Sequence, residues 1–126
     1  MDKADRIRIA LVEDDDILSS LYDEALSMMG FSVGIAKNGQ EALRIVEENN
    51  PHLVILDIVM PDGDGFFVLK KLKDNPRTRN IPVIMHTNLF SESDKAEALR
   101  LGAKEYVVKT EVTPKQLAEI VKKYVA

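Results

Sequence analysis

Short apolar segments that end at a polar or charged residue limit the fold of this chain more than any other feature. Four of them each lead to such residues: Ile7–Val12 to Glu13 and Asp14, Leu53–Leu56 to Asp57, Ile81–Met85 to Thr87, and Tyr106–Val108 to Lys109. Segments of helical periodicity separate them, which is typical of a parallel sheet covered by helices on both faces. The carboxyl ends of such strands lie along one edge, where ligands bind. We therefore expect the acids, the hydroxyl and the lysine to converge.

The rest of the pattern completes five strand–helix units. Phe31–Ala36 alternates in polarity, as expected for an edge strand with one less buried face. The predicted helices run from about Asp16 to Met29, from Asn38-Gly39 to about Glu48, through Val68, Leu69 and Leu72, over Glu92–Leu101, and onward from a capping box of Thr113, Pro114 and Gln116. The segment Pro61–Gly65 has the composition of a loop.

The first and the fourth predicted helices carry apolar stripes that we expect to face the sheet. The stripe of the first helix comprises Leu18, Leu21, Ala25 and Met29, and the thinner stripe of the fourth comprises Ala96 and Leu99, with Ala98 and Leu101. Just before the first helix, Asp15 or Asp16 is expected to serve as the N-cap. That assignment leaves Glu13 and Asp14 free for another role.

Composition excludes several classes of function. A length of 126 residues favours a single domain spanning residues 1–126, and the absence of cysteine excludes disulfide frameworks and thiolate metal sites. The net charge of −4, without a basic stripe, argues against nucleic-acid binding. No apolar run approaches the roughly 20 residues that span a bilayer, and the charged amino terminus does not resemble a signal peptide. We therefore expect a cytoplasmic protein.

Four segments of the sequence together resemble the response-regulator receiver domains of two-component phosphorelays, the CheY-like family. They are Leu11–Asp16, Val54–Gly65, Met85–Thr87 and Tyr106–Lys109, in the order that the family has them. The resemblance covers the whole chain, and the segment from Asp57 to Gly65 is its most specific part. It implies a doubly wound (βα)5, flavodoxin-like fold whose five parallel strands lie in the order 2-1-3-4-5.

The resemblance also implies a site and its chemistry. In receivers, the residue at the position of Asp57 accepts a phosphoryl group from the phosphohistidine of a sensor histidine kinase or a histidine phosphotransfer protein. The residues implied to hold Mg²⁺ are Asp14, Asp57, the Val59 backbone carbonyl and, through a water, Glu13. Lys109 and Thr87 are implied to bind phosphoryl oxygens. Such a domain is not an enzyme in the usual sense, since it catalyses only its own phosphorylation and dephosphorylation.

The family further implies a conformational switch. Thr87 moves toward the phosphoryl group, and Tyr106 turns into the space that it leaves. The readout surface consists of the fourth helix, the fifth strand and the fifth helix. A downstream protein, a fused output domain or a second copy in a phosphorylation-dependent homodimer would bind there. The chain would then be either a stand-alone regulator or a receiver excised from a longer protein.

Several positions bear on how this receiver differs from the usual pattern. Thr110 stands where proline is common and often cis, so we expect a trans bond after Lys109, and the turn that follows is one residue longer. Asn88 replaces a small residue beside the route to Asp57. Val59 and Leu89 flank that route and cannot orient a water by hydrogen bonding, which predicts slow autodephosphorylation. His52 and His86 are isolated and are interpreted as structural.

Three alternatives compete with this hypothesis. A haloacid-dehalogenase-type phosphatase needs a second aspartate two residues after the first, and Val59 occupies that position. A flavodoxin-type flavin domain needs a phosphate-binding loop after the first strand, where Glu13–Asp16 would repel phosphate. A receiver-like module that binds partners without phosphorylation stays open because of Asn88 and Thr110.

Overall fold

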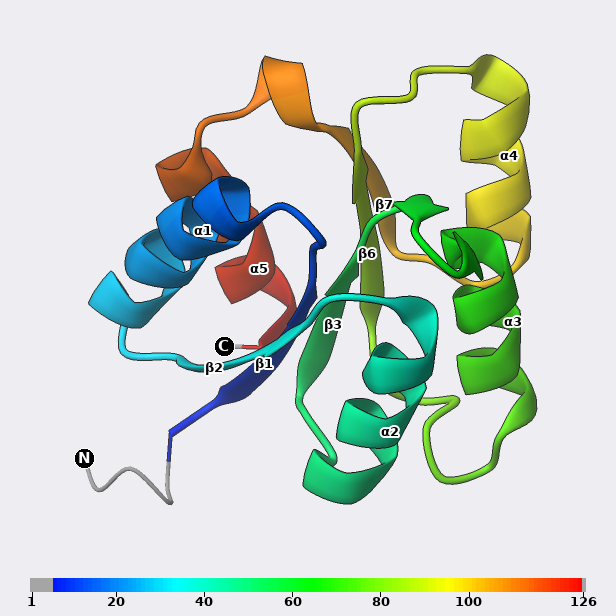
Figure 1. Cartoon of the computed structure of the whole chain (residues 1–126), viewed down its shortest axis with the longest axis horizontal. Coiled ribbons are helices and arrows are strands. Elements are labelled where there is room, and N and C mark those ends of the chain that lie inside the picture. Colours follow the sequence, from blue (N-terminus) through cyan, green and yellow to red (C-terminus); the bar gives the residue numbers. More distant parts are fainter. Residues whose placement is uncertain (1–5, 126) are drawn as a thin grey trace.

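A five-stranded parallel sheet forms the centre of the computed structural model, which describes residues 6–125 (Figure 1). Its strands are β1 (Arg8–Val12), β2 (Ser32–Ala36), β3 (Leu53–Leu56), β6 (Val83–Thr87) and β7 (Glu105–Val108). They lie in the order β2-β1-β3-β6-β7, and every neighbouring pair is parallel. Counted within this sheet alone, the order is 2-1-3-4-5, so the predicted fold class is confirmed.

Helices cover both faces of the sheet (Figure 1). The helices are α1 (Asp16–Met28), α2 (Gly39–Asn49), α3 (Gly65–Asp74), α4 (Glu92–Arg100) and α5 (Pro114–Val125). α1 and α5 pack on one face, and α2, α3 and α4 pack on the other. Successive side chains of a strand point to opposite faces, so Leu11 packs toward α1 and α5 while Ala10 and Val12 pack toward α2 and α3. This two-sided burial explains why the central strands are continuous apolar runs.

Side-chain caps fix where the helices begin. The capping residues accept a hydrogen bond from a backbone N–H of the first turn: Asp15 for α1, Asn38 for α2, Asp64 for α3 and Ser91 for α4. At α5, Thr113 and Gln116 exchange hydrogen bonds of 2.8 and 3.1 Å, which confirms the predicted capping box. The sequence predicted either Asp15 or Asp16 as the N-cap of α1, and the structure shows that it is Asp15.

The predicted apolar stripes of α1 and α4 are right in part: Leu18, Ala25 and Met29 of the first pack on the core, whereas Leu21 does not. In α1, Leu21 is 46% exposed, whereas Tyr22 and Leu26 are buried against the sheet. In α4, Ala96 and Leu99 face solvent, and only Ala98 with the following Leu101 packs on the core. Periodicity alone does not select between neighbouring apolar residues, such as Leu21 and Tyr22 in α1 or Leu99 and Ala98 in α4.

Three local features differ from the sequence prediction or refine it. The predicted loop after Met60 contains a small antiparallel ribbon, in which β4 (Val59–Met60) pairs with β5 (Gly63–Asp64). β6 starts two residues later than predicted and includes Thr87 itself. The longer turn after β7 forms a short 3-10 helix, η2 (Lys109–Glu111), and within residues 6–125 there is no cis peptide bond, so the expected trans bond after Lys109 is confirmed.

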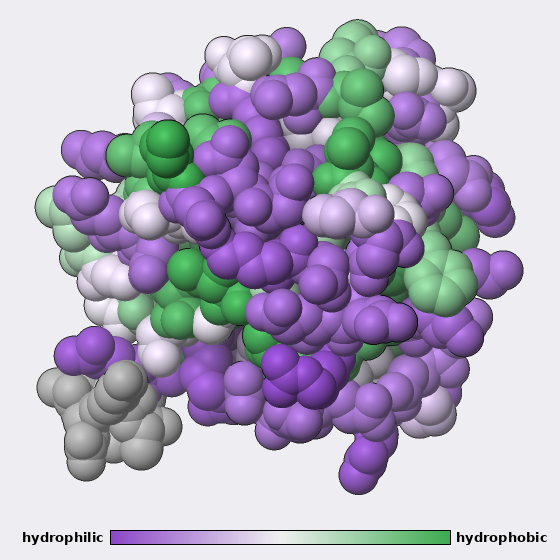
Figure 2. Space-filling model, viewed as in Figure 1, coloured by the Kyte–Doolittle hydropathy of each residue, from purple (hydrophilic) through white to green (hydrophobic). Residues whose placement is uncertain are grey.

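The surface is mainly hydrophilic on the side seen in Figure 2, with separate apolar patches. The large apolar side chains that are exposed are Ile17, Leu21, Met28, Val59, Phe67, Leu89, Phe90 and Leu99. Across residues 6–125, no helix combines the length and the apolar character that crossing a membrane requires.

Candidate functional site

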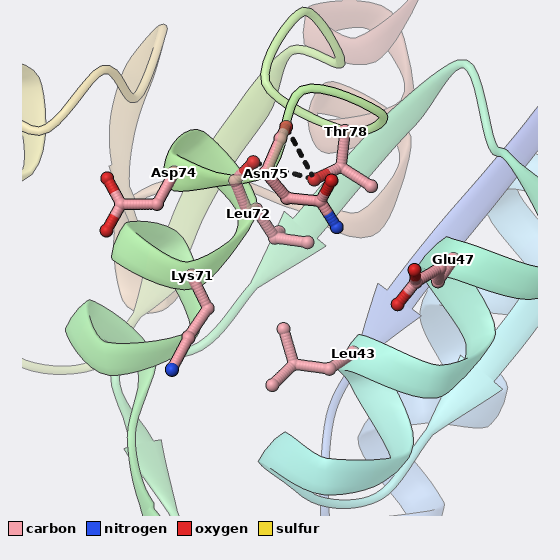
Figure 3. Close-up of a pocket in the computed structure, with 7 residues that line it drawn as sticks. All are labelled: Leu43, Glu47, Lys71, Leu72, Asp74, Asn75 and Thr78. Atoms are coloured by element: carbon pink, nitrogen blue, oxygen red, sulfur yellow. Dashed lines mark hydrogen bonds between the residues drawn. The ribbon is translucent and has the colours of Figure 1, made fainter.

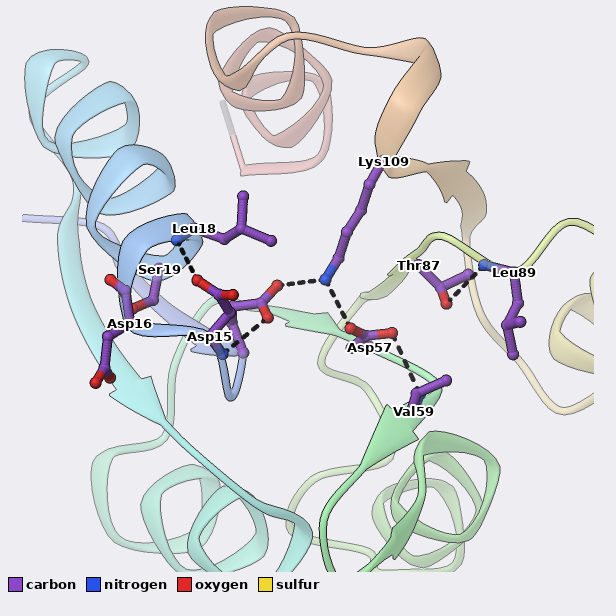
Figure 4. Close-up of polar contacts among 10 residues, drawn as sticks. Asp15, Asp16, Leu18, Ser19, Asp57, Val59, Thr87, Leu89 and Lys109 are labelled. Carbon is purple, nitrogen blue, oxygen red and sulfur yellow. Dashed lines mark hydrogen bonds and ion pairs between the residues drawn. The ribbon is translucent and has the colours of Figure 1, made fainter.

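The residues singled out from the sequence meet at the carboxyl edge of the sheet. Glu13 follows β1, Asp57 follows β3, Thr87 ends β6 and Lys109 follows β7. Figure 4 shows the Lys109 side chain reaching across to Asp57 from the opposite side of the site. The chain crosses from one half of the sheet to the other between β1 and β3, so the acids lie where open α/β sheets bind ligands.

Three carboxylates form a compact cluster. Oxygen atoms of Glu13, Asp14 and Asp57 all lie within 4.8 Å of one another. Glu13 is 1% exposed and Asp57 is 5% exposed, whereas Asp14 faces solvent. Two like charges about 4 Å apart repel by about 4 kcal/mol at an effective dielectric constant of 20. A nearby cation would therefore stabilise the cluster, which opens to solvent on the Asp14 side.

Lys109 supplies one such cation from within the protein. Its Nζ atom lies 2.5 Å from Glu13 Oε1 and 2.7 Å from Asp57 Oδ2. Burial lowers the pKa of Lys109, but the hydrogen bonds and charges of Asp57 and Glu13 outweigh it, so the pKa lies above its ordinary value. The other Glu13 oxygen accepts the Asp15 N–H at 3.2 Å. A single ammonium balances only part of the charge of three carboxylates.

The donor set suits a hard divalent cation. All three side chains offer oxygen, which Mg²⁺ prefers, and the exposed Asp14 provides an approach from solvent. Such an ion would compete with Lys109 for oxygens of Glu13 and Asp57. The residues present therefore fit the Mg²⁺ site that the sequence predicted.

The segment after Asp57 is held closely against the sheet. The Val59 N–H donates to Asp57 Oδ1 at 3.3 Å, and the Gly65 N–H donates to the Ile58 carbonyl at 2.7 Å. A Cβ atom at Gly65 would lie 2.1 Å from the Asp57 carbonyl oxygen, so only glycine fits there. The Val59 side chain, in contrast, is 57% exposed beside the Asp57 carboxylate. It is therefore free to face a ligand that approaches Asp57 from solvent.

The backbone of Leu89 links Thr87 to Tyr106. The fully buried Thr87 hydroxyl accepts the Leu89 N–H at 3.2 Å, and the Tyr106 hydroxyl donates to the Leu89 carbonyl. Burial, and then the charges of Asp94 and Asp57, raise the pKa of Tyr106. Among residues 6–125, no hydrogen bond joins Thr87 to Asp57 or Lys109. The two residues expected to form the switch thus contact the backbone of the same residue, Leu89, through its N–H and its carbonyl.

Two features near the site were not identified from the sequence. His86 is buried beside Thr87 with no partner for Nε2 among the described residues, and its ring lies edge-on to Tyr22 at 4.8 Å. Burial, followed by the charge of Lys109, lowers its pKa to about 4. Asp62, interpreted only as a loop residue, accepts two backbone hydrogen bonds from the start of α2. The position of His86 next to an apolar strand was a signal in the sequence, whereas nothing in the sequence marks the contact of Asp62 with α2.

A surface hollow of about 300 Å³ lies between α2 and α3, away from the carboxylates (Figure 3). Its lining includes Leu43 and Leu72, with Glu47 and Lys71 at its sides. The Thr78 hydroxyl is used internally, because it donates to the Leu72 carbonyl at 2.6 Å. No set of polar groups converges in this hollow as it does at Asp57.

Comparison with known proteins shows which family the chain resembles. The family model for the response regulator receiver domain matches residues 9–122. A probable transcriptional regulator ycf27 of Cyanophora paradoxa is 39% identical over 110 residues, which are 87% of this chain and 44% of the relative. This chain therefore spans about half the length of that protein.

Solved structures show the same similarity. A CheY-like response regulator receiver domain protein from Methanospirillum hungatei JF-1 has a TM-score of 0.88 at 29% identity, with 95% of this chain and 94% of that chain covered. The Mn²⁺-bound form of response regulator Rcp1 has a TM-score of 0.78 at 30% identity, with 92% and 89% covered.

Proposed function

This chain belongs to the response regulator receiver family, and we propose that it accepts a phosphoryl group on Asp57 from the phosphohistidine of a sensor histidine kinase or a histidine phosphotransfer protein. One observation carries the proposal: the buried Asp57 carboxylate lies within 4.8 Å of two further carboxylates and 2.7 Å from the Lys109 ammonium. A cation site and a mobile cationic side chain thus adjoin one nucleophile. That combination suits transfer of a negatively charged group.

Four groups would hold Mg²⁺ in this site: the carboxylates of Asp14 and Asp57, the Val59 backbone carbonyl and, through a water, Glu13. The ion would offset negative charge on the incoming phosphoryl group. The Mn²⁺-bound form of Rcp1, a structural neighbour, supports a divalent cation in this fold. The oxygen-only donor set favours Mg²⁺ as the cation of this chain.

The transfer itself needs little covalent assistance. An Asp57 oxygen attacks the phosphorus, a new O–P bond forms, and the N–P bond of the donor breaks with its electron pair returning to the imidazole. Lys109 is already hydrogen-bonded to Asp57. Its flexible side chain can turn its ammonium from the carboxylates to a phosphoryl oxygen. Positioning and electrostatics then account for most of the catalysis.

The output would follow from the Leu89 backbone. A Thr87 hydroxyl that turns to a phosphoryl oxygen gives up the Leu89 N–H, and the contact of Tyr106 with the carbonyl of the same residue is then free to change. The surface formed by α4, β7 and α5 would present this change to a downstream protein, to a fused output domain or to a second copy. Phosphorylation would thereby shift the populations of two conformations.

Intact-mass measurement after incubation with Mg²⁺ and acetyl phosphate tests the proposal. The parent should gain one phosphoryl group that hydroxylamine removes, and Asp57→Asn should gain none. Asp64→Asn, which changes another carboxylate of the same segment, should be labelled like the parent. Normal labelling of Asp57→Asn at another residue would overturn the assignment.

A further inference from the structure

Asp62 joins two parts of the molecule that are distant in sequence. It lies in the turn of the β4–β5 ribbon, and its Oδ1 accepts the Gly39 N–H at 2.8 Å while its Oδ2 accepts the Gln40 N–H at 3.0 Å. These bonds hold the pKa of the Asp62 carboxyl below its usual range, so the group stays ionised. Both oxygens are therefore committed to the first turn of α2.

The packing around this contact is close. A Cβ atom at Gly39 would lie 3.3 Å from Asp62 Oδ1 and 3.1 Å from a methyl carbon of Val68 in α3. Gly39 is buried, and α2 itself is anchored on the sheet through Ala42 and Val46. The carboxylate thus rests on an element whose position the core fixes.

The ribbon leads directly from Asp62 back to the acceptor. Within it, Val59 pairs with Asp64 and Met60 pairs with Gly63. The Val59 N–H also donates to Asp57. Fixing the tip of the ribbon at α2 therefore fixes the peptide that contains the Val59 carbonyl, because the ribbon joins the two.

We propose that Asp62 is a positioning residue for the cation site, which holds the Val59 carbonyl in place by clamping the β4–β5 ribbon to the amino end of α2. The inference rests on the proposed function, because it assigns a role toward the same cation. Asp62 itself touches neither the cation nor the phosphoryl group. Residues that orient ligands in this indirect way influence metal affinity strongly.

The test compares Asp62→Asn with two matched controls. Asparagine keeps one acceptor oxygen but places an amide NH₂ where the Gln40 N–H needs an acceptor. Asn38→Ala removes another cap of α2, the bond to the Glu41 N–H, without touching the ribbon. Asp64→Asn removes one charge from the same ribbon without touching α2. Urea unfolding without metal and amide exchange at Gly39 and Gln40 establish that each variant is folded and whether the clamp is open.

Mg²⁺ affinity by titration calorimetry is the deciding measurement. Asp62→Asn should bind Mg²⁺ about tenfold more weakly than the parent, whereas both controls should stay close to it. At saturating Mg²⁺, the rate of labelling by acetyl phosphate should return close to that of the parent. An Asp62→Asn affinity equal to that of the parent or of either control would overturn the inference. A parent that binds no Mg²⁺ would instead overturn the proposed function.

Discussion

The two segments that flank Asp57 differ in how they are held. On one side, the backbone from Asp57 to Gly65 is fixed by hydrogen bonds, by the β4–β5 ribbon and by the clamp of Asp62 on α2. On the other side, the exposed residues 88–90 are held mainly by two hydrogen bonds of the Leu89 backbone. Few buried contacts mean low local stability. The difference fits the proposed function, in which a signal from Asp57 would pass through the Thr87 side while the Val59 side would hold the site in place.

Gly65→Ala, in the segment after Asp57, should lower the free energy of unfolding far more than a substitution in the segment after Thr87. The new methyl group would overlap the Asp57 carbonyl, and backbone atoms cannot rotate out of the way as a side chain can. We expect a loss of about 3 kcal/mol in the free energy of unfolding, measured by urea denaturation. Asn88→Ala, in the other segment, should change it by less than about 0.5 kcal/mol. Equal losses in the two variants would contradict the comparison.

His86 should make stability depend on pH on the Thr87 side. Its folded-state pKa of about 4 lies below its ordinary value of 6.5, so between these values the unfolded chain binds a proton that the folded protein does not. The contribution of His86 to the free energy of unfolding is therefore fully present above the higher value and is lost as the pH falls. The loss should be about 2 kcal/mol from pH 7 to pH 5.

Unfolding curves at several pH values measure this dependence. Because carboxyl groups also titrate in acid, the contribution of His86 is the difference between the pH dependence of the parent and that of His86→Leu. His86→Leu should remove the contribution. The exposed His52, changed to Gln, should leave the slope as it is in the parent. Parallel slopes for all three proteins would show that His86 does not couple folding to pH.

The two entrance side chains, one from each segment, should control the lifetime of the phosphoryl group. Hydrolysis needs a water in line behind the phosphorus, and neither Val59 nor Leu89 can orient one. We expect a Val59→Asn, Leu89→Glu double variant to lose its label about tenfold faster than the parent, or about 1.4 kcal/mol of barrier. Loss of label after removal of the donor measures the rate, with Leu99→Glu on α4 as the control. A parent that loses its label as fast as the double variant would refute this.

Tyr106→Phe should have the smallest effect, because it removes only the hydroxyl that donates to the Leu89 carbonyl. The expected loss of stability is about 1 kcal/mol or less, since the site is partly exposed. Amide exchange should accelerate locally around Leu89. Tyr124→Phe removes a comparable bond to Glu105 and should leave exchange at Leu89 unchanged. If amide exchange around Leu89 were the same in Tyr106→Phe and in the parent, Tyr106 would not stabilise the segment after Thr87.

The sequence predicted the fold and the meeting of the site residues because both follow from strand ends. Leu53–Leu56 and its neighbours are continuous apolar runs only if both faces are covered, and the chemical groups stand where those runs stop. The double ion pair of Lys109 was not predicted, since it depends on side-chain distances across the sheet. Asp62 was missed for a related reason: its partners are backbone N–H groups 22 and 23 residues away, which carry no side-chain signature.

Lys109 acts as a tethered competitor for any cation at this site. Its ammonium binds oxygens of Glu13 and Asp57, and a divalent ion must displace it from them. The observed affinity for the ion should therefore be lower than it would be without the lysine. A phosphoryl group that draws the ammonium away removes this competition. By reciprocity, a bound cation must raise the affinity for the phosphoryl group by the same factor. We therefore expect positive cooperativity between the two ligands, arising from one lysine that both of them displace.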